Sequence, residues 1–264
     1  MMSKPLVSVI MGIYNCENSI EAAIESILQQ TYDNWELIMC DDGSTDSTYS
    51  IATRYMKQYP NKIVVMKNEK NLRLAATLNR CLGAAKGEYI ARMDADDVSL
   101  QQRFETQVTF LENHHECDIV GCSAKIFDGK NINGVRVCKA NPNKNDVLFG
   151  PPFIHPTIMI RKEVLDKLGG YTIASRTMRG QDWDLWFRFY AAGFSGHNIS
   201  EALYIYHESE DDYKKRTLQA AIGCSKTAFH GFQILKVAPW KYIYAIKPIV
   251  SWFVPEKIKK CRRT

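Results

Sequence analysis

The sequence predicts an α/β protein with a doubly wound, mainly parallel central sheet and flanking helices. Apolar runs of strand length alternate along its first half with segments whose apolar residues recur at helical spacing. Helices placed between strands in this way form right-handed crossovers, which join parallel neighbours in one sheet. With 264 residues, of which 45% are hydrophobic, the chain is large enough to bury the core that such a fold needs.

The first strand and the first helix have clear patterns. The run LVSVIMG at residues 6–12 is almost continuously apolar, as expected of a strand that is buried on both faces. The helix that follows opens on Asn18 and Glu21, which resemble a capping box. Its apolar face is expected to consist of Ile20, Ala23, Ile24, Ile27 and Leu28.

The alternation of strand and helix continues to residue 122. A second capping-box pattern, Ser99 with Gln102, predicts the start of a helix that runs to about His114. The runs WELIMC, KIVVM, EYIARM and DIVGC are the other strand candidates, at residues 35–40, 62–66, 88–93 and 118–122. The remaining helices are expected near residues 46–58 and 74–85.

The pattern becomes looser beyond residue 125. FDGKNING at residues 127–134 predicts a hairpin or loop, and NPNKND at 141–146 predicts a loop. Residues 154–171 predict a strand and then a short helix that ends at two glycines. A last helix is expected from about Asp182 to Gly193.

The charge of the chain is concentrated at its C-terminal end. Residues 214–264 contain twelve Lys and Arg and a single acid, so the net charge of this segment is +11. Because the whole chain has a net charge of +5, residues 1–213 carry −6. Three prolines exclude one long helix, and lysines alternate with Trp, Tyr and Ile. Short amphipathic segments of this kind suit an anionic membrane surface, which we expect residues 230–264 to contact. Alternatively, the aromatic side chains pack on the domain. No nucleic-acid recognition fold accompanies the charge, so no nucleic-acid partner is expected.

No feature of the sequence predicts export or a membrane span. The first five residues precede an apolar run of strand length only, unlike a signal peptide. No uninterrupted apolar stretch approaches the ~20 residues of a spanning helix. The eight cysteines form no CxxC pair, and their spacing suits neither a zinc site nor a disulfide scaffold. We therefore expect a cytoplasmic protein with reduced thiols, peripheral on the inner face of the cytoplasmic membrane.

Acidic motifs follow two of the predicted strands. DDGSTD begins at Asp41, and DADD occupies residues 94–97. Ligands of doubly wound sheets bind outside the carboxyl ends of the strands, which is where both motifs are expected. The chain has neither a GxGxxG turn after its first strand nor a P-loop. The acids could simply form solvated turns. Two such motifs instead favour Mg²⁺ or Mn²⁺ held by carboxylates and bridging to a diphosphate.

Segments of the sequence, taken in order, resemble glycosyltransferase family 2. They are VSVIMGIYN, QQTYDNWELIMCDDGSTD, NLRLAATLNRCLGAAKGEYIARMDADD, HPTIMIRKEVLDKLGGY and GQDWDLWFRF, which together cover about residues 6–210. The resemblance implies the GT-A fold and inverting transfer from a nucleotide-activated sugar. It also implies a domain at residues 1–215, with a nucleotide-binding half at about 1–115 and an acceptor-binding half at about 116–215, followed by a basic amphipathic extension at 216–264.

The resemblance assigns nucleotide binding to the ends of the first two strands. Gly12 and Tyr14 would line the pocket, with Tyr14 against the base. Asp42 would hydrogen-bond the base, commonly uracil, and Asp41 would lie on the ribose side. Arg73 stands where the family often has Gly, and it either contacts the diphosphate or is an exposed loop residue.

The resemblance also implies a metal site at DADD. Asp94 would lie toward the ribose and sugar, and Asp96 would bind the metal, Mn²⁺ or Mg²⁺. Asp94 or Asp97 is an alternative ligand, and His207 in YIYHESE matches a histidine that often contributes to the metal and diphosphate site.

Asp182 matches the family's catalytic aspartate, which acts as general base on the acceptor hydroxyl. Gln181 precedes it where the family usually has Glu, and we expect it to alter acceptor choice more than to abolish activity. Trp183 is expected near the acceptor and Trp186 in the core. His155 touches the donor diphosphate or the acceptor, or is a hydrogen-bonded core histidine.

The sequence therefore predicts a metal-dependent inverting glycosyltransferase. It would use a nucleotide sugar, expected to be a UDP-sugar, and extend a cell-surface saccharide on a polyprenyl carrier. A nucleotide-sugar binding or scaffold protein without turnover is the alternative, motivated by Gln181. A nucleotidyltransferase is disfavoured, because no Gly-rich, Arg-bearing loop follows the first strand.

Overall fold

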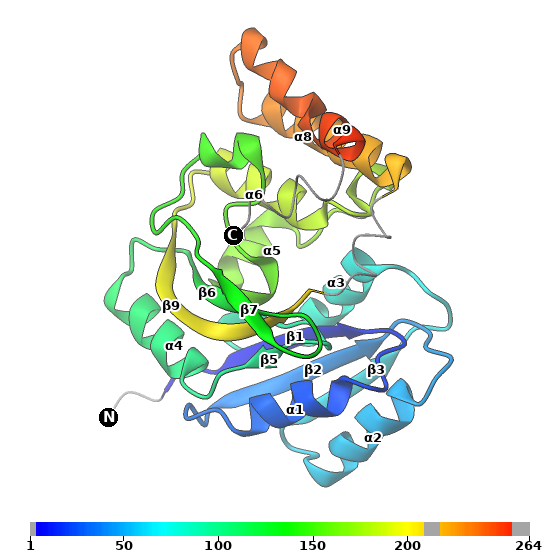
Figure 1. Ribbon diagram of the computed structural model, residues 1–264. Helices are drawn as coiled ribbons and strands as arrows, with labels where there is room; N and C mark the ends of the chain where they lie inside the picture. Colours follow the sequence, from blue (N-terminus) through cyan, green and yellow to red (C-terminus); the bar gives the residue numbers. More distant parts are fainter. Residues whose placement is uncertain (1–3, 209–216, 255–264) are drawn as a thin grey trace.

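The computed structural model describes residues 4–208 and 217–254, and its centre is a sheet of nine strands (Figure 1). Along the sheet the strands follow the order β3-β2-β1-β4-β8-β6-β9-β5, and β7 pairs with β6. The first four strands in this order run parallel. They are β3 (Ile63–Lys67), β2 (Trp35–Asp41), β1 (Val7–Ile13) and β4 (Tyr89–Arg92).

Helices cover both faces of this parallel part. One apolar cluster joins alternate β1 side chains such as Val9 to α1 (Ile20–Leu28), α2 (Thr48–Gln58) and α4 (Arg103–Asn113). A second cluster joins Ile10, on the opposite face, to α3 (Leu74–Ala84), α5 (Lys162–Leu168) and α6 (Gln181–Ala191). Because successive side chains of a strand point to opposite faces of the sheet, β1 is buried on both faces. The predicted doubly wound sheet is confirmed.

The second half of the sheet is mixed. β8 (Met159–Arg161) runs antiparallel to β4 and to β6 (Ile119–Phe127), while β6 and β9 (Gly196–His207) are parallel. The strand predicted at residues 118–122 is β6, which extends to Phe127 and is longer than expected. β6 also pairs antiparallel with β7 (Ile132–Arg136), which confirms the predicted hairpin. Short 3₁₀ helices follow as η1 (Asp146–Phe149), η2 (His155–Thr157) and η3 (Ser175–Thr177).

Both predicted capping boxes are wrong. α1 begins after Ser19 with no side-chain cap, so Asn18 does not serve as the cap. Ser99 lies in β5 (Val98–Ser99), opposite Tyr204 of β9, and α4 begins only at Arg103. The backbone N–H of Ser99 donates to Ser26 Oγ, 3.1 Å away. Long-range pairing with β9 thus overrides the local helix signal at this position.

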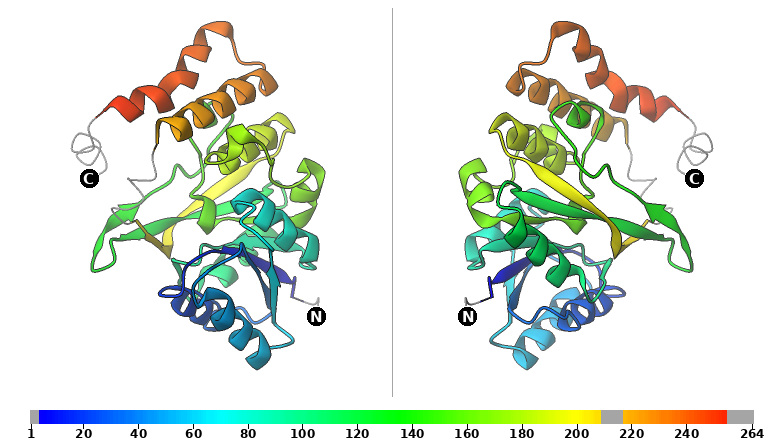
Figure 2. Two further views of the ribbon diagram at one scale, coloured as in Figure 1. Left: turned by 90° about the vertical axis from the view of Figure 1, so that its right-hand side faces the viewer. Right: turned by 90° about the vertical axis from the view of Figure 1, so that its left-hand side faces the viewer.

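The C-terminal segment packs against the rest of the protein through α8 (Leu218–Ile234), which is followed by η4 (Pro239–Ile246) and α9 (Lys247–Phe253). These elements form the end of the molecule opposite α1 and α2 (Figure 2). Pro239 and Pro248 lie in the first turns of η4 and α9 and divide the segment as expected, while Pro255 lies outside the described residues. Within the described residues, no helix combines the length and the apolar character that crossing a membrane requires.

Close contact between α8 and α6 depends on Gly231. A Cβ atom at this position would lie 2.1 Å from Cδ2 of Phe187. Gly231→Ala is therefore expected to lower the free energy of unfolding by about 1–3 kcal/mol through overpacking, measured by urea denaturation. Gly83→Ala in α3 is the matched control, because a Cβ there meets nothing within 4 Å. That control should raise stability by up to about 1 kcal/mol, and equal losses in both variants would contradict the packing argument.

Candidate active site

A cleft of about 880 Å³ opens where β4 and β9 end and α6 begins. Its other wall is the segment from Arg136 to Pro156. Asp182 is almost ninety residues from the DADD motif in sequence, yet both line this cleft. Of the predicted site residues, the structure brings together Asp94, Asp96, Asp97, His155, Gln181, Asp182 and His207 along its wall.

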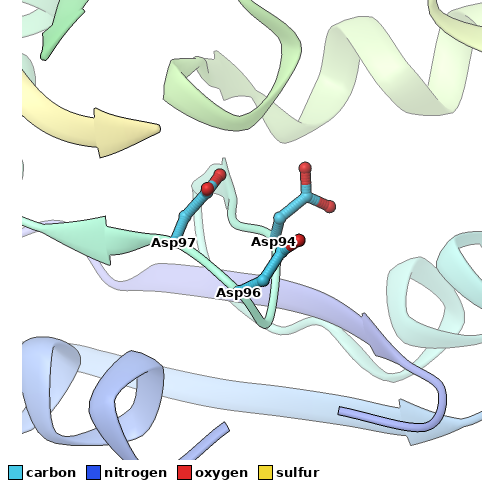
Figure 3. Close-up of side chains that lie close together, drawn as sticks. All are labelled: Asp94, Asp96 and Asp97. Carbon is cyan, nitrogen blue, oxygen red and sulfur yellow. The ribbon is translucent and has the colours of Figure 1, made fainter. Parts of the chain in front are cut away.

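Asp94, Asp96 and Asp97 form a compact acidic cluster on the loop that leaves β4 (Figure 3). One oxygen from each carboxylate lies within 4.8 Å of the others. Desolvation in the cleft, followed by repulsion from Asp94, raises the pKa of Asp96 to about 6. Burial and the two neighbouring carboxylates raise the pKa of Asp97 well above its usual range. The cluster therefore favours binding of a positive partner.

Arg92 supplies one positive charge from within the chain. Its guanidinium, only 3% exposed, forms an ion pair through Nη2 with Oδ1 of Asp94. The Nε and Nη1 atoms of Arg92 are buried without a hydrogen-bond partner in the described part of the chain. Arg92 also lines the cleft, and the sequence prediction missed its role. The strand period was an available signal, because residues 92 and 94 lie on the same face of an extended segment.

The environment of Asp97 fits a divalent cation. Its side chain is 2% exposed, and Oδ1 accepts a hydrogen bond from the backbone N of His207 at 2.7 Å. Oδ2 is buried without a hydrogen-bond partner among the described residues. A buried, unpartnered carboxylate oxygen beside two further carboxylates is a donor set that Mn²⁺ and Mg²⁺ accept.

His207 lies in the cleft but outside the acidic cluster. Its ring is 5.8 Å from that of Phe127, and a Cβ on Gly129 would lie 3.5 Å from its Nε2. To bind the metal as predicted, His207 would have to bring a ring nitrogen closer to the carboxylates of the acidic cluster.

The predicted base-binding residues lie at the neighbouring strand ends and do not line the cleft described above. Asp42 is buried and holds the loop between β3 and α3. Its Oδ1 accepts from Asn68 Nδ2 at 2.7 Å and from the backbone N of Leu72 at 2.8 Å. Its Oδ2 accepts from the backbone N of Arg73 at 2.9 Å. Asp41 is fully buried and accepts from the backbone N of Ser44.

The chain near Gly12 is tightly packed against α3. A Cβ on Gly12 would lie 3.0 Å from Cδ1 of Leu74, whose side chain lines the cleft. Tyr14 is about half exposed and accessible to a ligand. Arg73 has φ +74°, a backbone region that favours glycine. Its side chain is exposed.

Gln181 and Asp182 occupy the first turn of α6 and face the cleft. Oδ1 of Asp182 accepts a hydrogen bond from the backbone N of Trp183 at 2.8 Å. Burial raises the pKa of Asp182, while that hydrogen bond and Arg92 act in the opposite direction. A carboxylate with a raised pKa beside a cleft is suited to accept a proton.

The structure does not support the expected stacking of Trp183 on an acceptor. The side chain is 6% exposed, and Nε1 donates to the carbonyl O of Val147 at 2.7 Å. Trp186 is buried as predicted. His155 lines the cleft and is also hydrogen-bonded, with Nε2 2.8 Å from the Tyr171 hydroxyl. Burial lowers its pKa well below the usual range, so His155 is neutral near pH 7.

The sequence profile described as Glycosyl transferase family 2 matches residues 8–169, more than half of the chain. A protein named as a candidate glycosyltransferase, EpsE of Bacillus subtilis, is 45% identical over 258 residues, covering 98% of this chain and 93% of EpsE. The Escherichia coli UDP-Glc:alpha-D-GlcNAc-diphosphoundecaprenol beta-1,3-glucosyltransferase WfaP is 31% identical, covering 74% of each chain.

Solved structures show the same fold at lower identity. TarS of S. aureus, residues 1–349 in complex with UDP, gives a TM-score of 0.65 at 22% identity, covering 87% of this chain and 69% of that one. The mannosyltransferase PcManGT of Pyrobaculum calidifontis, with GDP-Man and Mn²⁺, gives 0.67 at 19%, covering 95% and 75%. The profile match and the similarity to these relatives and structures show that the chain belongs to glycosyltransferase family 2 and has the GT-A fold.

Proposed function

We propose that the protein is a metal-dependent inverting glycosyltransferase that moves a sugar from a UDP-sugar to a saccharide acceptor on a polyprenyl carrier. The observation that carries the proposal is the convergence of Asp182 with the acidic cluster on one cleft. A general base for the acceptor and carboxylates for a metal diphosphate are the two parts that such a transfer needs.

Asp182 would act on the acceptor side of the cleft. Its carboxylate removes the proton of the acceptor hydroxyl while that oxygen attacks the anomeric carbon. The C–O bond to the diphosphate breaks in the same displacement, and attack from the opposite face inverts the configuration. Lying in the first turn of α6, Asp182 is held in place by the backbone N of Trp183.

The donor side would be organised by the β4 loop. Arg92 fixes the Asp94 carboxylate, which would face the ribose and the sugar. Asp96 and Asp97 would hold Mn²⁺ or Mg²⁺, with His207 as a further contributor. When bound, the ion would supply Lewis-acid stabilisation of the leaving diphosphate. Asp41, Asp42, Gly12 and Tyr14 would shape the nucleotide pocket, with Arg73 at its edge.

The acceptor class is inferred from relatives and from the basic extension. WfaP is named for an undecaprenol diphosphate acceptor, and AmsE of Erwinia amylovora is named for amylovoran biosynthesis. We therefore infer a role in cell-surface polysaccharide synthesis. Gln181 and His155 would contact the acceptor. Residues 230–264 would hold the enzyme peripherally on the inner face of the cytoplasmic membrane.

Transfer assays with purified protein test this proposal. The protein is incubated with Mn²⁺, a panel of UDP-sugars and GlcNAc-diphosphoundecaprenol, and both UDP release and the extended lipid are measured. We expect acceptor-dependent UDP release with one donor. Saturable UDP binding without any extended product from a panel of lipid-linked acceptors would instead support the scaffold alternative.

A further inference from the structure

Several large apolar side chains of η4 and α9 are exposed, and together we call them the apolar face. Trp240, Ile243 and Phe253 are 76%, 66% and 69% exposed. Residues 239–253 contain no acid. So dense an exposed group of apolar and aromatic residues indicates a contact surface. The other members of the apolar face are Ile246 and Val250.

The apolar face is not the inner side of a loosely attached segment. Tyr242 of η4 packs its ring against Phe229 and Phe232 of α8, with centroids 5.1 and 5.7 Å apart. Ala245 is buried on the same inner side. These contacts fix the rotation of η4 and leave Trp240 and Ile243 exposed to solvent.

A small cavity beside the apolar face is lined by Lys144, Lys236 and Lys241, and we call it the lysine cavity. Its volume is about 170 Å³, and no carboxylate lines it. The rest of its wall includes Leu148 and Val237. Three lysines at one concavity provide positive charge that attracts a phosphate, and the apolar wall suits the carbon chain attached to that phosphate.

The apolar face and the lysine cavity reach the active cleft through η1. Phe149 lines the cleft, and its ring lies 4.9 Å from that of Tyr244. Its carbonyl O accepts a hydrogen bond from Lys247 Nζ at 2.6 Å. Leu148, one residue earlier, lines the lysine cavity. The three features therefore meet at one edge of the cleft.

We propose that the apolar face and the lysine cavity form a docking site for an anionic phospholipid bilayer. The apolar face enters the headgroup region, and the lysine cavity binds the phosphate of one lipid. Charge favours this occupant, because residues 217–254 contain four lysines and no acid. The inference extends the proposed function by naming the surface through which a lipid-linked acceptor would reach the cleft, but binding to vesicles requires no transfer.

Vesicle flotation with the full-length protein tests the docking site. Phosphatidylcholine vesicles with and without phosphatidylglycerol are compared. Lys144→Gln/Lys236→Gln should weaken binding to the anionic vesicles about tenfold or more, since each basic residue near such a surface contributes ~1 kcal/mol. The control, Lys57→Gln/Lys86→Gln, removes the same charge from exposed lysines outside the cavity and should change binding less than about twofold.

The apolar face is tested by Ile243→Asn/Phe253→Asn. These exposed positions tolerate polar residues, so unfolding should be unchanged while vesicle binding falls about tenfold or more. Wild-type protein that stays unbound at low salt, or equal losses in both lysine pairs, would overturn the proposal. Release by millimolar inorganic phosphate would show that the lysine cavity takes a free anion. UDP binding is measured for every variant. A variant that still binds UDP but not vesicles has lost the docking site only, so failure of the docking proposal can be told apart from failure of the proposed glycosyltransferase function.

Discussion

Replacing Asp182 by asparagine is expected to reduce glycosyl transfer by about 10²- to 10⁴-fold, the contribution typical of a general base. The amide is the same size and keeps an acceptor oxygen for the backbone N of Trp183, so the first turn of α6 should be preserved. UDP affinity should be unchanged, because the residues proposed to bind the nucleotide and the metal lie at the ends of β1, β2 and β4 and not on α6. Initial rates and UDP titrations on the same preparation provide the measurement.

Asp184, two residues along α6, provides a comparison. It is buried and accepts from Thr172 Oγ1, Arg176 Nη2 and Arg188 Nε at 2.6–2.9 Å. Asp184→Asn should therefore lower stability, while the rate per folded molecule stays close to wild type. An Asp182→Asn enzyme with undiminished transfer would rule out Asp182 as the base.

The pH dependence gives a second readout of the same assignment. Burial raises the pKa of Asp182 above the ordinary value of about 3.9. A base is active only when deprotonated, so transfer should decline as the pH falls through that raised pKa. The decline should begin at a higher pH than for an unperturbed aspartate. The residual rate of Asp182→Asn should lack this acidic limb, whereas a retained limb would assign it to another group.

Local sequence patterns were sufficient to place the acidic motifs, because a parallel strand delivers whatever follows it to one edge of the sheet. That rule applies to Asp41 and to Asp94 without knowledge of any relative. It does not apply to Asp182, which reaches the cleft from the start of a helix. Its role came only from the resemblance, since periodicity does not say which helix end faces which strand end.

Other features depend on contacts that periodicity does not encode. The sequence pattern predicted the helix α6, but not that the carbonyl O of Val147, in η1, would accept a hydrogen bond from the indole N–H of Trp183. Ser99 has a good local helix signal and still joins β5, because β9 offers a strand to pair with. The glycine-like conformation of Arg73 is a backbone property that residue identity alone does not reveal.

Asp96 is expected to control metal-dependent nucleotide binding. The Asp94 carboxylate is paired with Arg92, and Asp97 accepts a hydrogen bond from His207. The Asp96 carboxylate has no such partner in the described part of the chain and is the most exposed of the three. It is therefore the ligand that an ion can recruit with the least rearrangement. Asp96→Ala should remove the effect of Mn²⁺ on UDP binding.

Thermal unfolding provides the measurement. At about 100 times its Kd, a ligand adds about 2.7 kcal/mol to wild-type stability. The wild-type protein should show this gain with UDP and Mn²⁺ together and lose most of it on chelation, whereas Asp96→Ala should show the chelated value throughout. Asp33→Ala, an exposed aspartate paired with Lys4, should respond as wild type does. UDP binding of equal strength with and without the ion would mean that the acidic cluster has a purpose other than holding a metal diphosphate.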